Sequence, residues 1–180
     1  MWTRSTTRTD YRMNNGINPL DVTKVLISHL HKDHAGGICK KDLQHDALSF
    51  PNAQYYINRD EWLKAREETA SYIPRDYAIL KDNVHLTLST GDITIDNYIS
   101  LKVTGGHSPF HQVFWIKEGN QVIFFGGDVA PQAQQMKNRF IAKYDFDGKK
   151  SMELRSEWWQ QGQKEKWTFL FYHDIKTPFI

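Results

Sequence analysis

The chain has 180 residues, of which 39% are hydrophobic and 13% aromatic, and its 23 basic side chains nearly balance 21 acidic ones, for a formal net charge of +2. This length and composition predict a folded domain with a hydrophobic core and exclude a disordered chain. The balanced charge argues against a nucleic-acid partner and against an anionic membrane surface. With a single cysteine, Cys39, the chain cannot form an internal disulfide.

The two ends of the chain differ in pattern. Residues 1–15 are polar and have neither helical nor strand periodicity, so we predict a disordered or poorly structured N-terminus followed by one α/β domain over residues 16–180. No apolar run approaches the roughly 18 residues of a membrane span, and the first 16 residues lack the apolar core of a signal peptide. We therefore expect a cytoplasmic protein with no membrane partner.

Strand and helix patterns alternate along the domain. Asp60 and Glu61 fall near the start of the first predicted helix, where the helix dipole favours acidic side chains. Residues 71–90 give no clear pattern. The expected strands are 24–28, 53–58, 98–103, two strands within 112–125 around a turn at 118–120, and 167–172; the expected helices are 59–70 and 151–163.

Four of these strands run into side chains that can bind a metal ion. The first leads into His29, His31, Asp33 and His34 within the segment "HLHKDH", and Gly36 and Gly37 follow. Two histidines two positions apart in an extended segment point to the same side and can bind one ion. Imidazole and carboxylate donors suit zinc, and also manganese or iron. The pattern predicts a metal site at the strand ends.

Four segments together resemble the metallo-β-lactamase-fold hydrolase superfamily. "HLHKDH" resembles its H-x-H-x-D-H signature, "TGGHSPFHQ" resembles the segment with the next histidine, His107, and "VIFFGGD" resembles the strand that ends in a bridging aspartate, Asp128. "FLFYHD" resembles the last strand and its histidine, His173. The resemblance covers the chain from about Gly16 to its end and implies an αββα sandwich.

The resemblance also implies two divalent metal ions, for which we expect zinc, with manganese and iron as alternatives. Asp33 and Asp128 would in addition be catalytic. Of the other histidines, we expect His111 to make a supporting hydrogen bond and His45 and His85 to lie on the surface. The implied ligands are His29, His31 and His107 for one ion, Asp33, His34 and His173 for the other, and Asp128 as the bridge.

The activity implied is hydrolysis of an ester-like bond in a small molecule, namely a lactone, ester, thioester or phosphoester, by a hydroxide that bridges the two ions. The lactonase and aryl-esterase branch is the most similar. Lactonases of that branch carry a tyrosine shortly after the bridging aspartate, whereas this chain has "DVAPQ", and Tyr144 is too distant in sequence to equate with it.

Two alternatives stay open. One is a mononuclear iron enzyme that resembles persulfide dioxygenases. The other is an inactive metal-binding fragment, because only 28 residues precede His29 where the family usually has several strands. We therefore expect a sandwich that lacks much of its N-terminal half-sheet, with low stability or a homodimer as the consequence.

Overall fold

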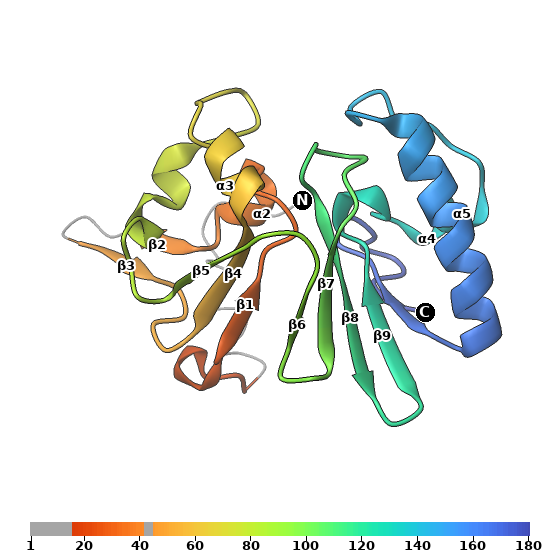
Figure 1. The fold of residues 1–180 in the computed structure, drawn as a ribbon, viewed down its shortest axis with the longest axis horizontal. Coiled ribbons are helices and arrows are strands. Elements are labelled where there is room, and N and C mark those ends of the chain that lie inside the picture. The colour runs from red at the N-terminus through yellow and green to blue at the C-terminus, as the bar shows by residue number, and fades with distance from the viewer. Residues whose placement is uncertain (1–15, 42–44) are drawn as a thin grey trace. The chain divides into compact units, whose positions relative to one another are not determined.

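The computed structural model describes residues 16–41 and 45–180, which fold as two compact units with the boundary between Leu88 and Ser89. Both units contain strands and helices, as the predicted α/β class requires (Figure 1). The prediction for residues 1–15 lies outside the described residues. That residues 16–180 form a single domain stays a prediction.

The first unit is built on a sheet of three strands in the order β1 (Lys24–Leu26), β4 (Gln54–Asn58) and β5 (Leu86–Ser89), with β1 parallel to β4. A two-stranded antiparallel ribbon joins β2 (Cys39–Lys41) to β3 (Asp46–Leu48). The unit also contains η1 (Pro19–Asp21), α2 (Lys32–Ala35), α3 (Arg59–Lys64), η2 (Pro74–Asp76) and η3 (Ala78–Leu80). Its core is a single apolar cluster around the fully buried Leu30, Tyr55, Ile57 and Leu80.

Helix α3 begins where it was predicted but is shorter. The Asn58 side chain accepts hydrogen bonds from the backbone amides of Asp60 and Glu61, which caps the first turn. The prediction that the helix continues to residue 70 is wrong, because it ends at Lys64. Further along, the Thr69 hydroxyl accepts from the backbone amide of Tyr72, which forms a turn over residues 69–72.

The second unit contains a sheet of five strands in the order β10-β9-β8-β7-β6. Neighbouring strands are antiparallel from β6 to β9, and β10 is parallel to β9. The predicted pair of strands within 112–125 is confirmed. The bounds are β6 (Ile93–Ile95), β7 (Ile99–Val103), β8 (Gln112–Glu118), β9 (Gln121–Phe125) and β10 (Thr168–Leu170), with η4 (Gly127–Val129), α4 (Ala133–Lys137) and α5 (Gly148–Glu165) as helices.

Helix α5 lies along the sheet of the second unit (Figure 1). It begins at Gly148, earlier than predicted, because the Asp147 side chain caps it by accepting from the amide of Lys150. Trp158 is buried, and its ring centroid lies 4.9 Å from that of Phe124 on β9. Trp158 thus packs the helix onto the sheet. Within the part of the chain that the structure describes, no helix is long and apolar enough to cross a membrane.

Candidate metal centre

The first unit places three imidazoles together just after β1. His29 is completely buried, and its ring centroid lies 4.5 Å from that of His31 and 4.2 Å from that of His34. His31 precedes the first turn of α2, and His34 lies within that helix. The short helix therefore brings His34 back toward the two histidines of the extended segment.

Asp33 is the carboxylate of the same segment. It lies on α2, its side chain is 47% exposed, and its Oδ2 is 3.6 Å from Nε2 of His34. The first unit thus supplies four candidate donors from six consecutive positions. All four come within eight residues after the half-buried strand β1.

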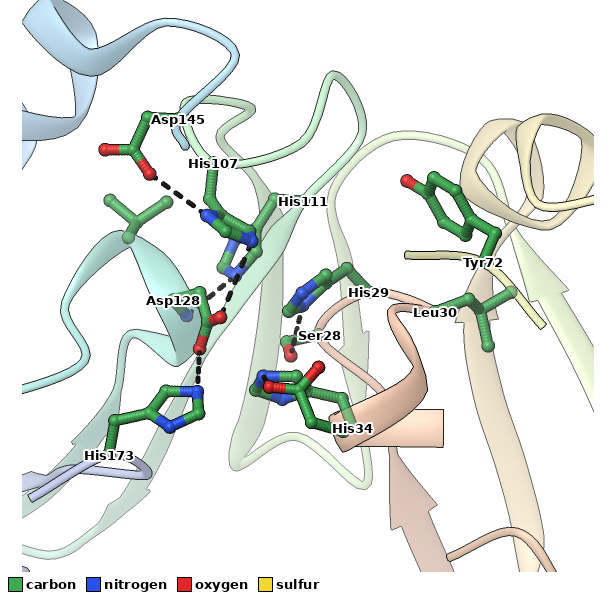
Figure 2. A network of polar contacts seen from close by, with 12 residues as sticks. Ser28, His29, Leu30, His34, Tyr72, His107, His111, Asp128, Asp145 and His173 are labelled. Atoms are coloured by element: carbon green, nitrogen blue, oxygen red, sulfur yellow. Dashed lines mark hydrogen bonds and ion pairs between the residues drawn. The ribbon is translucent and has the colours of Figure 1, made fainter. Parts of the chain in front are cut away.

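Buried groups from distant parts of the first unit hold this loop. Glu61 of α3 is completely buried, and its Oε1 accepts from the amide of Leu30 at 2.9 Å and from the hydroxyl of Tyr72 at 3.0 Å. The Tyr72 ring in turn lies edge-on to His31, with 4.7 Å between ring centroids. Ser28 Oγ is 3.1 Å from Nδ1 of His29 (Figure 2). These contacts fix both the backbone between the two histidines and the rings themselves.

In the second unit, His107 lies in a closed loop between β7 and β8. The carbonyl of His111 accepts from the amides of Thr104 and Gly105, which ties the two ends of the loop together. Gly106 has φ +89°, in the left-handed region, and a Cβ built on it would lie 2.7 Å from the Ser151 hydroxyl oxygen. Gly106 thus lets the chain turn tightly against α5 just before His107, which is buried.

Asp128 lies between two histidines of the second unit (Figure 2). It follows β9 on η4, and its side chain is 9% exposed. Its Oδ2 is 3.5 Å from Nε2 of His107, and its Oδ1 is 3.2 Å from Nε2 of His173. His173 follows β10, where its amide donates to the carbonyl of Pro131. Each oxygen of one carboxylate therefore faces a different imidazole.

These separations fit the geometry of metal ligation. Two ligand atoms that each lie about 2.1 Å from one tetrahedral zinc ion are about 3.4 Å apart. The 3.5 and 3.2 Å separations at Asp128 lie close to that value. The donor set of the second unit could hold divalent ions with its carboxylate between them.

Several other side chains had been singled out from the sequence. His111 makes the expected supporting hydrogen bond, because its Nε2 accepts from the amide of Asp128 at 3.2 Å. Asp174, the residue after His173, accepts through its two oxygens from the amides of Ala133 and Thr177 and so fixes the loop after β10. His45 is exposed, as predicted, whereas His85 is half-buried.

Two side chains at the second-unit histidines were not predicted. Asp145 Oδ1 lies 3.0 Å from Nδ1 of His107, and only 1% of this side chain is exposed. Tyr144, which is 60% exposed, presents its ring edge-on to that of His107, with 5.7 Å between centroids. Both come from the segment "YDFD", which carries no local pattern that would have identified them.

Comparison with known proteins places the chain in a family. The family model described as "Metallo-beta-lactamase superfamily" matches residues 5–173. An N-acyl homoserine lactonase of Bacillus cereus is 26% identical over 162 residues, which are 89% of this chain and 59% of that protein. N-acyl homoserine lactonase AttM of Azorhizobium caulinodans is 31% identical over 114 residues, which are 57% of this chain and 38% of that protein. The chain thus spans less than two thirds of the length of these relatives.

Solved structures share the fold. A probable metal-dependent hydrolase from Staphylococcus aureus has a TM-score of 0.81 at 23% identity, over 93% of this chain and 60% of that one. AidC, described as a dizinc quorum-quenching lactonase in complex with a product, has a TM-score of 0.78 at 21% identity, over 99% of this chain and 66% of that one. Since the family model covers nearly the whole chain and the ligand motifs lie inside the matched region, the chain belongs to the metallo-beta-lactamase superfamily.

Proposed function

We propose that this chain contributes the metal-binding machinery of a hydrolase that cleaves an ester-like bond. The observation that carries the proposal is the carboxylate of Asp128, whose two oxygens face the Nε2 atoms of His107 and His173. A carboxylate with one imidazole at each oxygen is suited to bridge two cations. The proposed ligands are His29, His31 and His107 for one ion and Asp33, His34 and His173 for the other, with Asp128 shared.

The ions proposed are divalent, with zinc preferred. Bound there, they would supply an activated water nucleophile and Lewis acidity toward the carbonyl or phosphoryl oxygen of the substrate. The protein's own contribution is to present neutral imidazoles and carboxylates at fixed positions. We propose that Asp128 and Asp33 also accept protons during the reaction, and the 47% exposure of Asp33 leaves its carboxylate open to solvent.

For the substrate we propose a lactone or a related ester. The support comes from the relatives, several of which are named N-acyl homoserine lactonases. This chain lacks a tyrosine directly after Asp128, where lactonases of this branch carry one, and instead places the Tyr144 ring next to His107. We therefore expect a preference among lactones and aryl esters that differs from that of the named relatives.

Elemental analysis of the purified chain tests the proposal directly. We expect about two divalent ions per chain, and fewer in the Asp128→Asn variant. Asp82→Asn is the matched control, because Asp82 is exposed and lies outside the proposed ligand set. Hydrolysis of acyl homoserine lactones, aryl esters and phosphoesters would then be assayed on the loaded protein. A single bound iron, with persulfide oxidation and no hydrolysis, would replace the proposal with the dioxygenase alternative.

A further inference from the structure

Asp145 is a buried carboxylate whose position is fixed by the loop that carries His107. The amide of Phe146 donates to the carbonyl of His107 at 3.1 Å, and the amide of Asp147 donates to the carbonyl of Gly106 at 2.7 Å. Both bonds come from the residues directly after Asp145, next to the contact between Asp145 Oδ1 and His107 Nδ1 (Figure 2). The segment that carries the carboxylate is therefore bonded to the loop that carries the imidazole.

The contact determines which nitrogen of His107 carries the proton. An ionised carboxylate can only accept hydrogen bonds, so Nδ1 must be the donor at 3.0 Å. In a neutral imidazole the other nitrogen, Nε2, then has a lone pair and no proton. Nε2 is also the atom that faces Asp128, at 3.5 Å from Oδ2. Nε2 of His107 and Oδ2 of Asp128 are then two neighbouring acceptors, and a cation bound to both would stabilise them.

A buried positive charge accompanies Asp145. Arg155 of α5 is 1% exposed and donates to the carbonyls of Val129 and Phe140. Burial lowers the pKa of the Arg155 guanidinium, and the negative charge of Asp145 opposes that shift. Arg155 thus contacts the backbone of the residue after Asp128 while its charge offsets that of the carboxylate behind His107.

We propose, building on the metal site proposed above, that Asp145 is a positioning residue that keeps His107 in the Nδ1–H form with Nε2 directed toward a divalent cation. A carboxylate behind a metal-binding histidine orients the ring and raises its basicity. Asp145 would act only through His107.

The first measurement is the tautomer of His107 in the metal-free wild-type chain. Long-range 1H–15N correlation spectra distinguish the two imidazole nitrogens, and a His107→Gln variant assigns the signal. We expect the Nδ1–H tautomer in the wild type and the Nε2–H tautomer in Asp145→Asn. The amide oxygen of Asn accepts a hydrogen bond less strongly than a carboxylate does, and its NH2 group can instead donate to Nδ1. An Nε2–H tautomer in the wild type would overturn the proposal.

The second measurement is zinc affinity by competition with a chromophoric chelator. We expect Asp145→Asn to bind zinc about 10- to 100-fold more weakly, with partial rescue by Asp145→Glu. Asp147→Asn is the matched control, since Asp147 lies two positions away, is exposed and caps α5 without touching the His107 ring. Equal zinc affinity in Asp145→Asn and the wild type would refute the role.

The two proposals can fail separately. The tautomer needs no metal, so a wild-type chain that binds no zinc but shows Nδ1–H would reject the proposed function and support the positioning of His107. A wild-type chain that binds two ions, together with an Asp145→Asn variant of unchanged zinc affinity, would support the proposed function and reject the positioning role of Asp145.

Discussion

Glu61 offers the sharpest test of how the first unit holds its histidines. Its buried carboxylate accepts two hydrogen bonds, from the amide of Leu30 and from the hydroxyl of Tyr72. Glu61→Gln keeps the size and shape but removes the charge. A hydrogen bond to a charged group contributes about 1.5–3 kcal/mol and a neutral one about 0.5–1.5 kcal/mol, so the two bonds together should lose about 2–3 kcal/mol.

The loss should be local as well as global. Since Leu30 lies between His29 and His31, weakening its hydrogen bond loosens the backbone that carries both rings. We expect faster amide exchange for residues 28–32 by mass spectrometry, and zinc binding about 10- to 100-fold weaker than in the wild type. Amide exchange is measured for this one segment because the two compact units need not unfold in one transition, so a single global unfolding curve would not report on the first unit alone.

Glu67→Gln is the control for this experiment. Glu67 lies close to Glu61 in sequence but is exposed, and its 3.1 Å ion pair with Lys64 is of the surface type that contributes little. We expect urea unfolding of Glu67→Gln to stay within about 0.5 kcal/mol of the wild type. If Glu61→Gln behaved like Glu67→Gln in both exchange and unfolding, the carboxylate would not be the support that we infer.

Two further predictions concern packing and pH. In Gly162→Ala the new Cβ would lie 2.2 Å from the ring of Phe169, so we expect thermal unfolding to show that the free energy of unfolding falls by about 1–3 kcal/mol, despite a gain of about 1 kcal/mol in helix propensity. Adding Phe169→Leu should restore part of this stability. A Gly162→Ala variant that is more stable than the wild type would contradict the packing. Burial, and then the charges of nearby carboxylates, raise the pKa of Tyr77 above its usual 10, so the folded state loses stability as pH rises past about 10, where the unfolded phenol ionises first. Tyr77→Phe should remove about 1.4 kcal/mol of that loss in total between pH 9 and 11 in urea titrations, and an unchanged pH dependence would count against it.

Strand-end residues were the part of the site that the sequence predicted well. His29 and Asp128 follow short apolar runs within three positions, and those runs form the half-buried strands β1 and β9. Period and composition reveal such runs because burial in a sheet selects apolar, β-branched side chains. The side chain at the end of each run could therefore be placed without knowing how the strands pair.

Short elements and element ends were predicted less well. Strands β5 and β6 have only four and three residues, which is too short for their alternation to stand out from the polar stretch around them. Helix α5 begins at Gly148 because Asp147 caps it. Its first three residues, Gly148, Lys149 and Lys150, show no apolar periodicity, so the sequence pattern placed the start too late. Helix α3 ends at Lys64 although helix propensity continues beyond it, and the Thr69 hydroxyl accepts from the amide of Tyr72 in a later turn that propensity alone does not predict.

The supports of the candidate site were not predicted, and the reason is the separation along the chain. Glu61 bonds to the loop of the first unit across 31 positions, and Asp145 contacts His107 across 38. Each carboxylate stands in a polar segment where its burial cannot be read from its neighbours, because burial here is produced by tertiary packing. The candidate ligands can thus be identified from local sequence, whereas the buried carboxylate that supports them in each unit is distant in the chain. A relative with the same motifs but without these two acids should consequently bind metal more weakly, even though its motif match would be as good.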